Sequence, residues 1–273
     1  MMPGARDRTP EPEVAMRWLA ASETSLPTGT SWLSPREAAY LETVRFTKRR
    51  TEFLLRRHTG KRAVCAVLDL PTDPGMLARV ELLNRPSGAP YALVDGAPAA
   101  LDISLSDRAG WAVALVGGEG SMANGTLGID LELAEPRSAG FLTDFLTEAE
   151  QAFVGSLPAE HHRHAAANVI WSAKEAALKV LQVGLRADTR TVEVDLRRPA
   201  DAAGGVVDGW RPLSVRHVEG STFPGWWRRD SAFLLPRAGR EPAPPPSLLP
   251  GGDDLTAATP IHSWLASPVV TPE

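Results

Sequence analysis

Hydrophobic and polar positions in the first part of the chain predict a strand followed by helices. Residues 14–20 are mostly apolar and are predicted as a strand. Ser34 is a candidate N-cap, a proline follows it, and Glu37 stands three residues after the cap. These signals predict a helix that ends at about Val44, and the pattern over residues 48–59 predicts a second helix.

From residue 80 onward, short alternating segments separated by glycine and proline predict strands. These segments lie at residues 80–84, 90–94, 101–106, 111–117 and 126–133. Residues 138–182 have helical spacing, and further strands are predicted at 191–196, 212–220 and 230–236. The order strand, helices, strands therefore occurs twice, which predicts an α+β fold made of two similar halves.

Proline is concentrated at the two ends of the chain. Twelve of the 24 prolines lie in residues 1–12 and 236–273. Segments of this composition rarely form a packed core, so we expect flexible tails at residues 1–12 and 237–273. The two halves are then predicted at residues 13–123 and 124–236.

The net charge of −4 argues against a protein that binds nucleic acid through a basic surface. No segment approaches the ~18 consecutive apolar residues of a membrane span. The single cysteine, Cys65, excludes an internal disulfide, and the first residues lack the apolar core of a signal peptide. We therefore expect a cytoplasmic protein with no nucleic-acid or membrane partner.

Basic residues are concentrated in one segment of this acidic chain. Residues 45–62 contain eight Lys and Arg residues and one acidic residue, Glu52. Such a segment is either a solvated helix face or a binding site for an anion such as a phosphate. The sequence leaves both interpretations open.

Two carboxylates are close together in the strand predicted over residues 126–133. Alternate residues of a strand face the same side, so Asp130 and Glu132 would project together, opposite Ile129 and Leu131. Neighbouring carboxylates repel each other, and a bound cation would remove that cost. A strand with a polar surface face is the alternative.

The helix predicted over residues 159–182 adds a third carboxylate. Glu175 and Lys179 are one helical turn apart and therefore lie on the same face. They could form an ordinary surface ion pair. Glu175 could instead complete an oxygen-only site with the two strand carboxylates, which is the type of ligand that Mg²⁺ takes.

Two motifs together resemble the paired signature of the 4'-phosphopantetheinyl transferases. They are Gly128-Ile129-Asp130-Leu131-Glu132 and, about forty residues later, Trp171-Ser172-Ala173-Lys174-Glu175-Ala176-Ala177-Leu178-Lys179. Three earlier segments are similar to that family in the same order: residues 53–57 to its first-half helix, 87–91 to its Gly-Lys-Pro turn and 103–107 to its Ser-His strand end. The chain length is similar to that of the longer, Sfp-type branch.

This resemblance implies a pseudo-twofold pair of α+β halves with the active site between them. It implies transfer of 4'-phosphopantetheine from coenzyme A to a serine of an apo acyl or peptidyl carrier protein, with 3',5'-ADP as the other product. The metal would be Mg²⁺, or Mn²⁺ in its place. The protein would act as a monomer, as members of the longer branch usually do.

The resemblance also implies roles for particular residues. Asp130, Glu132 and Glu175 would hold the metal ion. Glu175 would act as the base, with Glu132 as the second choice, and Lys179 would stabilise the leaving phosphate. The candidates for binding coenzyme A are Arg50, Arg57, Gly88, Pro90, Ser106, Asp107, Asp130, Lys174 and Lys179.

Two positions depart from the family pattern. Asp107 stands where the family usually has a histidine near the nucleotide phosphates, so we expect it to turn away, to pair with a nearby arginine or to help bind metal. Ala89 stands where the family often has a lysine. These departures keep open a non-catalytic protein that binds coenzyme A or a carrier, and the same carboxylates would also suit a Mg²⁺-dependent phosphate hydrolase.

Overall fold

The computed structural model describes residues 16–117, 127–183, 187–196 and 206–262. The tail predicted at residues 1–12 lies outside these residues. The described residues form mixed helices and sheets, so the predicted α+β class is confirmed. None of the described helices is long and apolar enough to cross a membrane.

Up to Gly117, the described residues form helices packed on two sheets. The helices are α1 (Pro35–Thr43), α2 (Thr47–Val67) and α3 (Pro74–Arg79), after a short 3-10 turn, η1 (Glu23–Ser25). The strands are β1 (Met16–Ser22), β2 (Val80–Asn84), β3 (Pro90–Val94), β4 (Ala97–Pro98), β5 (Asp102–Arg108) and β6 (Trp111–Gly117). One sheet has the order β13-β1-β6-β5, where β13 (Ser247–Leu248) comes from the end of the chain, and the other has the order β2-β3-β4.

From Leu127 onward, the described residues form a second set of helices on one larger sheet. The helices are α4 (Ala139–Phe145), α5 (Glu148–Ser156) and α6 (Glu160–Val180), with 3-10 turns η3 (Thr189–Thr191) and η4 (Leu255–Ala257). The strands are β7 (Leu127–Ile129), β8 (Glu132–Leu133), β9 (Val192–Asp195), β10 (Arg211–His217), β11 (Thr222–Asp230) and β12 (Phe233–Gly239). The sheet order is β7-β12-β11-β10-β9, and β8 also pairs with β12.

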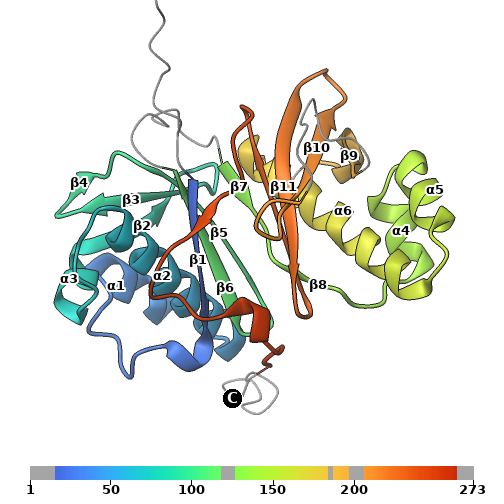
Figure 1. The fold of residues 1–273 in the computed structure, drawn as a ribbon. Helices are drawn as coiled ribbons and strands as arrows, with labels where there is room; N and C mark the ends of the chain where they lie inside the picture. The colour runs from blue at the N-terminus through green and yellow to red at the C-terminus, as the bar shows by residue number, and fades with distance from the viewer. Residues whose placement is uncertain (1–15, 118–126, 184–186, 197–205, 263–273) are drawn as a thin grey trace, which may run out of the picture.

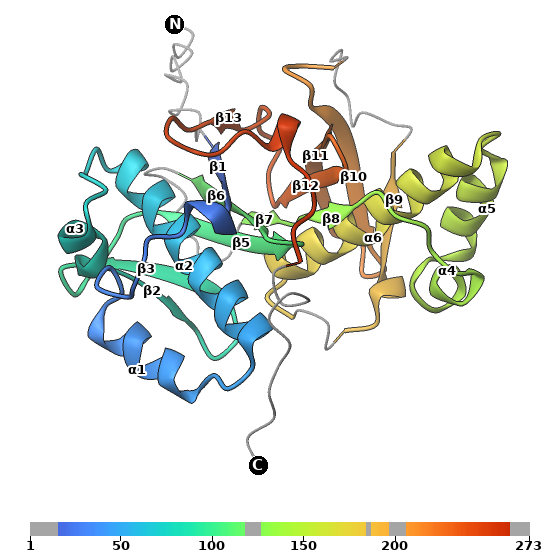
Figure 2. The same ribbon diagram turned by 90° about the horizontal axis from the view of Figure 1, so that it is seen from below.

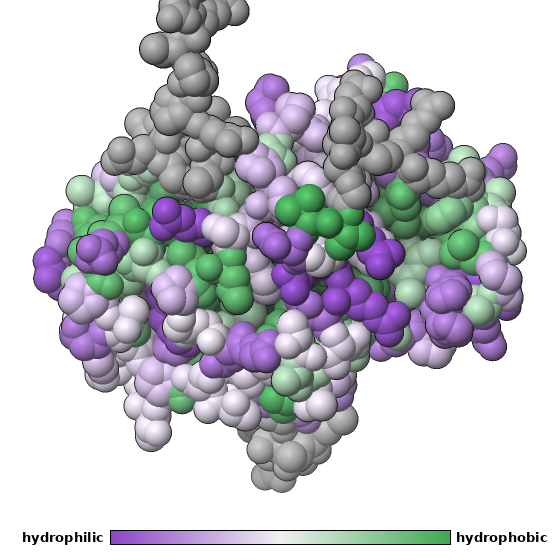
Figure 3. Space-filling view, in the orientation of Figure 1, coloured by the Kyte–Doolittle hydropathy of each residue, from purple (hydrophilic) through white to green (hydrophobic). Residues whose placement is uncertain are grey.

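The sheets meet in the middle of the molecule, with α1–α3 on one side and α4–α6 on the other (Figure 1). A shared apolar core joins them. Its buried residues include Trp18 and Trp111 from the first half and Ile129 and Phe233 from the second. On the face drawn in Figure 3, hydrophobic and hydrophilic residues are interspersed over both halves, and no single apolar area covers it.

A buried ion pair anchors the first half. Ser34 and Glu37 form the capping box that the sequence predicts at the start of α1, and Glu37 is 2% exposed. The Glu37 carboxylate also accepts a hydrogen bond from the Leu82 amide at 3.0 Å and pairs with Lys61 of α2. Lys61 is fully buried, so its ammonium is satisfied within the protein, by Glu37 and by backbone carbonyls.

The second half contains the same arrangement. Thr147 and Glu150 form a capping box at the start of α5, and the Glu150 carboxylate accepts a hydrogen bond from the Val194 amide at 2.7 Å. Lys174 of α6 is fully buried and lies 2.8 Å from Glu150. It also donates to the carbonyls of Thr189 and Val192. Each half is thus held together by a capped helix, a buried lysine and a strand amide.

Several elements of the structure differ from the sequence-based predictions. The single strand predicted over residues 126–133 is interrupted, because Asp130 and Leu131 separate β7 from β8. The helical region predicted over 138–182 consists of three helices, α4, α5 and α6, with the N-cap residues Ser138, Thr147 and Ala159, and the helix predicted from residue 159 corresponds to α6. Strand β11, which contains Pro224 and Gly225, was not predicted at all.

The flexible tail predicted from residue 237 is wrong as far as residue 262. β12 continues to Gly239, and β13 then pairs in parallel with β1 (Figure 2). The Asp253 carboxylate accepts hydrogen bonds from the Ser22 amide at 2.7 Å and the Ser25 hydroxyl at 2.5 Å. Leu255 is 2% exposed, so residues 247–262 pack on the first half as part of the fold.

Candidate active site

A cleft of about 530 Å³ lies between the two halves, which is an ordinary volume for a small-molecule site. One wall comes from the turn before β3 and from β5, including Gly88, Pro90 and Ser106. The other wall comes from residues around β7 and β8 and from α6. The acidic and basic side chains of that wall are Asp130, Glu132, Glu175 and Lys179.

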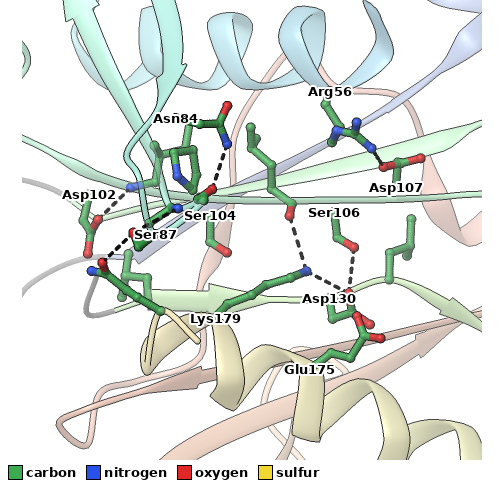
Figure 4. Close-up of a pocket in the computed structure, with 18 of the residues that line it drawn as sticks. Arg56, Asn84, Ser87, Asp102, Ser104, Ser106, Asp107, Asp130, Glu175 and Lys179 are labelled. Carbon is green, nitrogen blue, oxygen red and sulfur yellow. Dashed lines mark hydrogen bonds and ion pairs between the residues drawn. The ribbon is translucent and has the colours of Figure 1, made fainter. Parts of the chain in front are cut away.

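Asp130 lies at the centre of the polar contacts in the cleft (Figure 4). It is 3% exposed. Its Oδ1 accepts from the Ser106 hydroxyl at 2.7 Å and from Lys179 Nζ at 2.8 Å, and its Oδ2 accepts from the Ser172 hydroxyl at 2.6 Å. The Asp130 carboxylate therefore joins β5 of the first half to α6 of the second.

Close contact between β7 and α6 brings these groups together. A Cβ atom at Gly128 would lie 1.9 Å from the carbonyl oxygen of Ala176, which no side chain tolerates. Only glycine allows this approach of strand and helix. Lys179 then reaches across to donate to the Ile129 carbonyl at 2.7 Å as well as to Asp130. The glycine of the first motif is thus required by packing.

Glu175 carries an unusually high pKa. Burial, followed by the negative charge of Asp130, raises its pKa to about 7, while Lys179 acts in the opposite direction. Glu132 also raises this pKa, and Arg108 lowers it. A group with a pKa near neutrality can exchange a proton at ordinary pH.

Glu132 is held by two arginines, one from each half of the molecule. Its Oε2 lies 3.2 Å from Arg108 Nε of β5 and 3.3 Å from a terminal nitrogen of Arg137. Burial raises its pKa, and Arg108 partly offsets that effect. Sequence reasoning missed both arginines. Arg137 lies in a short loop whose sequence carries no recognisable pattern.

The donor set of the cleft suits a divalent cation. Asp130, Glu132 and Glu175 all line it and offer oxygen only, as Mg²⁺ prefers. Within the described residues, however, no three acidic, histidine or cysteine side chains are gathered closely enough to hold a metal ion as they stand. Mg²⁺ commonly takes one or two carboxylates together with waters and substrate phosphates, so the donor chemistry fits such an ion.

Asp107 pairs with Arg56, which is one of the three outcomes expected for it. Both residues line the cleft, at the end away from Ser87 (Figure 4). Arg57 also lines the cleft and donates to the Asn84 side chain at 2.8 Å. Sequence reasoning placed anion binding in this basic segment but chose Arg57 without Arg56.

Two predicted coenzyme A ligands lie elsewhere. Lys174 is buried in the second half against Glu150 and does not line the cleft. Its position on α6 differs by one residue from Glu175, so it faces about 100° away. Arg50 donates to the carbonyls of Leu41 and Val44, where it satisfies the end of α1. Neither side chain is available to a ligand in the cleft.

The second half of the chain also matches a known family. Residues 126–226 match the family model of the 4'-phosphopantetheinyl transferase superfamily. The match includes both motifs, so the resemblance is confirmed for this part of the chain. This superfamily consists of transferases, so the match indicates phosphopantetheine transfer in general terms. No curated protein matches the chain. The similarities noted at residues 53–57, 87–91 and 103–107 lie outside the matched segment.

Proposed function

We propose that this protein transfers the 4'-phosphopantetheine group of coenzyme A to a serine of an apo carrier protein and releases 3',5'-ADP. One observation supports this above others: Asp130, Glu175 and Lys179 lie together on one wall of an interdomain cleft, inside the segment that matches the transferase superfamily. The carrier would be an acyl or peptidyl carrier protein or domain.

Asp130, Glu132 and Glu175 are the residues that would hold Mg²⁺, with Mn²⁺ as a substitute. The ion would supply neutralisation of the charge on the coenzyme A pyrophosphate. Asp130 is fixed by two serines and by Lys179, and Glu175 lies close enough to Asp130 for their charges to interact. This pair would provide the principal protein oxygens of the site.

Glu175 would accept the proton of the carrier serine as its hydroxyl attacks the phosphorus next to the pantetheine arm. Its raised pKa matches that task near neutral pH. Lys179, held beside Asp130, would stabilise the negative charge that develops on the leaving 3',5'-ADP. The phosphorus–oxygen bond to the leaving phosphate breaks as the bond to the serine oxygen forms.

Arg56 and Arg57 would bind the phosphates of the nucleotide, with Gly88, Pro90 and Ser106 along the same wall. Asp107 would compete with the ligand for Arg56. We also propose that the two halves form a pseudo-twofold pair in which one chain supplies both walls, so that a monomer suffices. The two buried lysine–glutamate pairs support that arrangement.

A carrier-protein panel tests the proposed function. Each apo carrier is incubated with coenzyme A and Mg²⁺, with and without a chelator, and its mass is measured. We expect one carrier to gain one phosphopantetheine, with loss of the product on chelation and in Asp130→Ala. Phosphate release without a mass gain would instead identify a hydrolase. Binding of coenzyme A with neither result would identify a non-catalytic protein.

A further inference from the structure

Four charged side chains form an alternating ring at the edge of the cleft. Arg108 Nε and a terminal nitrogen of Arg137 approach Glu132 Oε2 at 3.2 and 3.3 Å. The same two arginines approach Glu135 Oε1 at 2.6 and 3.3 Å. Arg108 comes from β5 of the first half and the other three from the second, so the ring closes across the cleft.

Arg137 is itself held firmly in place. Its Nε donates to the Asn168 side chain at 2.6 Å, and its guanidinium lies 4.5 Å from the centre of the Phe141 ring. Asn168 is fully buried on α6 and donates to the carbonyls of Glu135 and His164. A guanidinium fixed by a buried amide is a rigid partner for a carboxylate.

The hydrogen bonds and ion pairs that the Glu132 carboxylate forms with the described residues all involve one of its two oxygens. Both guanidiniums approach Oε2, and the Leu133 amide donates to Oε2 at 3.2 Å. Among the described residues, none is shown to donate to Oε1. The Glu132 side chain is 13% exposed and lines the cleft, so one oxygen is fixed and the other remains for a ligand.

We propose that Arg108 and Arg137 are positioning residues that fix Oε2 of Glu132 and thereby present Oε1 to a divalent cation in the cleft. Partners of this kind orient ligating carboxylates, and their loss typically weakens metal affinity by about 10- to 100-fold. This proposal depends on the metal site of the proposed function. It assigns these two arginines to the metal site and excludes them from binding the nucleotide phosphates.

A double-mutant cycle on metal affinity tests the proposal. The full-length protein is titrated with Mn²⁺ in the presence of coenzyme A and without a carrier, and free Mn²⁺ is measured by electron paramagnetic resonance. We expect Arg137→Ala to raise the dissociation constant about 10- to 100-fold. In the Glu132→Gln background, the same change should add less than about twofold, because Arg137 acts through Glu132.

Two further variants keep the result unambiguous. Arg190→Ala removes an exposed ion pair with Asp188 in the same half and should leave Mn²⁺ affinity unchanged. Arg108→Ala should reproduce the cycle if Arg137→Ala does not fold. The proposal is overturned if both arginine variants bind Mn²⁺ within twofold of the wild type, or if their cost persists in Glu132→Gln.

Mn²⁺ binding and transfer activity are separate measurements. A wild type that binds Mn²⁺ and shows the cycle but modifies no carrier would contradict the proposed function and leave the role of the arginines standing. A wild type that modifies a carrier but shows no coupling between Arg137 and Glu132 would contradict the role of the arginines and leave the proposed function standing. A wild type that binds no Mn²⁺ would contradict the arginine proposal outright.

Discussion

The two halves of the molecule share the same buried lysine–glutamate pair, but they differ in the residues that lie beside it. Each has a capped helix whose N3 glutamate pairs with a fully buried lysine. In α6 the residues one and five positions after that lysine are Glu175 and Lys179, which line the cleft. In α2 the residues at the same spacing are Arg62 and Ala66.

The strands show the same difference. Ser22 of β1 pairs with the first residue of β6, and Leu133 of β8 pairs with the first residue of β12. Leu19 lies three residues before Ser22, and Asp130 lies three residues before Leu133. The two residues therefore occupy equivalent positions. Leu19 is 1% exposed in an apolar core, whereas Asp130 is 3% exposed and accepts three hydrogen bonds. Equivalent positions therefore hold an apolar side chain in one half and a hydrogen-bonded carboxylate in the other.

The largest expected effect is a loss of activity specific to one half. Asp130→Asn should lower the rate of carrier modification about a thousandfold while the protein remains folded, since it removes charge that the proposed reaction needs. Leu19→Ala should leave the activity of the folded protein intact and lower the free energy of unfolding by about 2–5 kcal/mol. Urea titration and a label-transfer assay on both variants check this pair. Comparable activity losses would contradict the division of roles.

The buried lysines should behave alike. Lys61→Met and Lys174→Met each remove the buried ammonium that pairs with a buried glutamate, which costs about 3–5 kcal/mol of unfolding free energy. Under conditions where the variants are folded, the KM for coenzyme A should not change in either. A KM that rises only in Lys174→Met would restore the role that the sequence suggested for this residue.

The C-terminal residues packed on the first half should contribute less. Asp253→Ala removes an acceptor from the Ser22 amide and the Ser25 hydroxyl, which should cost about 1–3 kcal/mol of unfolding free energy. Arg79→Ala, which removes an exposed ion pair with Asp95 from the last turn of α3, should cost under about 1 kcal/mol. Equal thermal unfolding temperatures for the two variants would mean that residues 247–262 contribute little to stability.

Local signals explain what the sequence predicts well. The capping residues Ser34 and Glu37 and the spacing of Glu175 and Lys179 are short-range patterns, and both appear in the structure as expected. Long-range contacts explain the failures. The family resemblance suggests Lys174 and the basic segment suggests Arg50 as ligand contacts, yet each is satisfied by groups that only the tertiary fold brings near.

Composition was also misleading at the end of the chain. Proline-rich residues 240–250 lack helical or alternating patterns, but the edge of β1 and a hydrogen bond from Leu249 to Trp18 order them. Strand β11 was missed for a related reason, since Pro224 and Gly225 weaken the local strand signal. The Ser22–Asp253 contact joins residues 231 positions apart, and no local pattern can indicate it.

The stability of the protein is also predicted to depend on pH, because α6 carries Glu175 where α2 carries Arg62. The pKa of Glu175 rises from an ordinary 4.5 in the unfolded chain to about 7 in the folded one. The folded state therefore holds the proton more tightly, and stability from this group is lost as pH rises from about 4.5 to about 7. In metal-free buffer, Glu175→Gln should unfold at a higher temperature than wild type at pH 8, and the gain should shrink towards pH 5. Arg62→Gln, at the matching position of α2, should show no such trend.

The smallest effect is expected at Asp107, which lies beside the arginines that line the cleft. Asp107 of β5 pairs with Arg56 and lines the cleft, whereas its counterpart by register on β11, Arg229, is exposed and outside the cleft lining. If Asp107 competes with phosphate for Arg56, Asp107→Asn should lower the KM for coenzyme A about two- to fivefold with little change in kcat. Arg229→Gln should leave KM unchanged. A higher KM in Asp107→Asn would mean that the Arg56–Asp107 pair orients the arginine for its ligand.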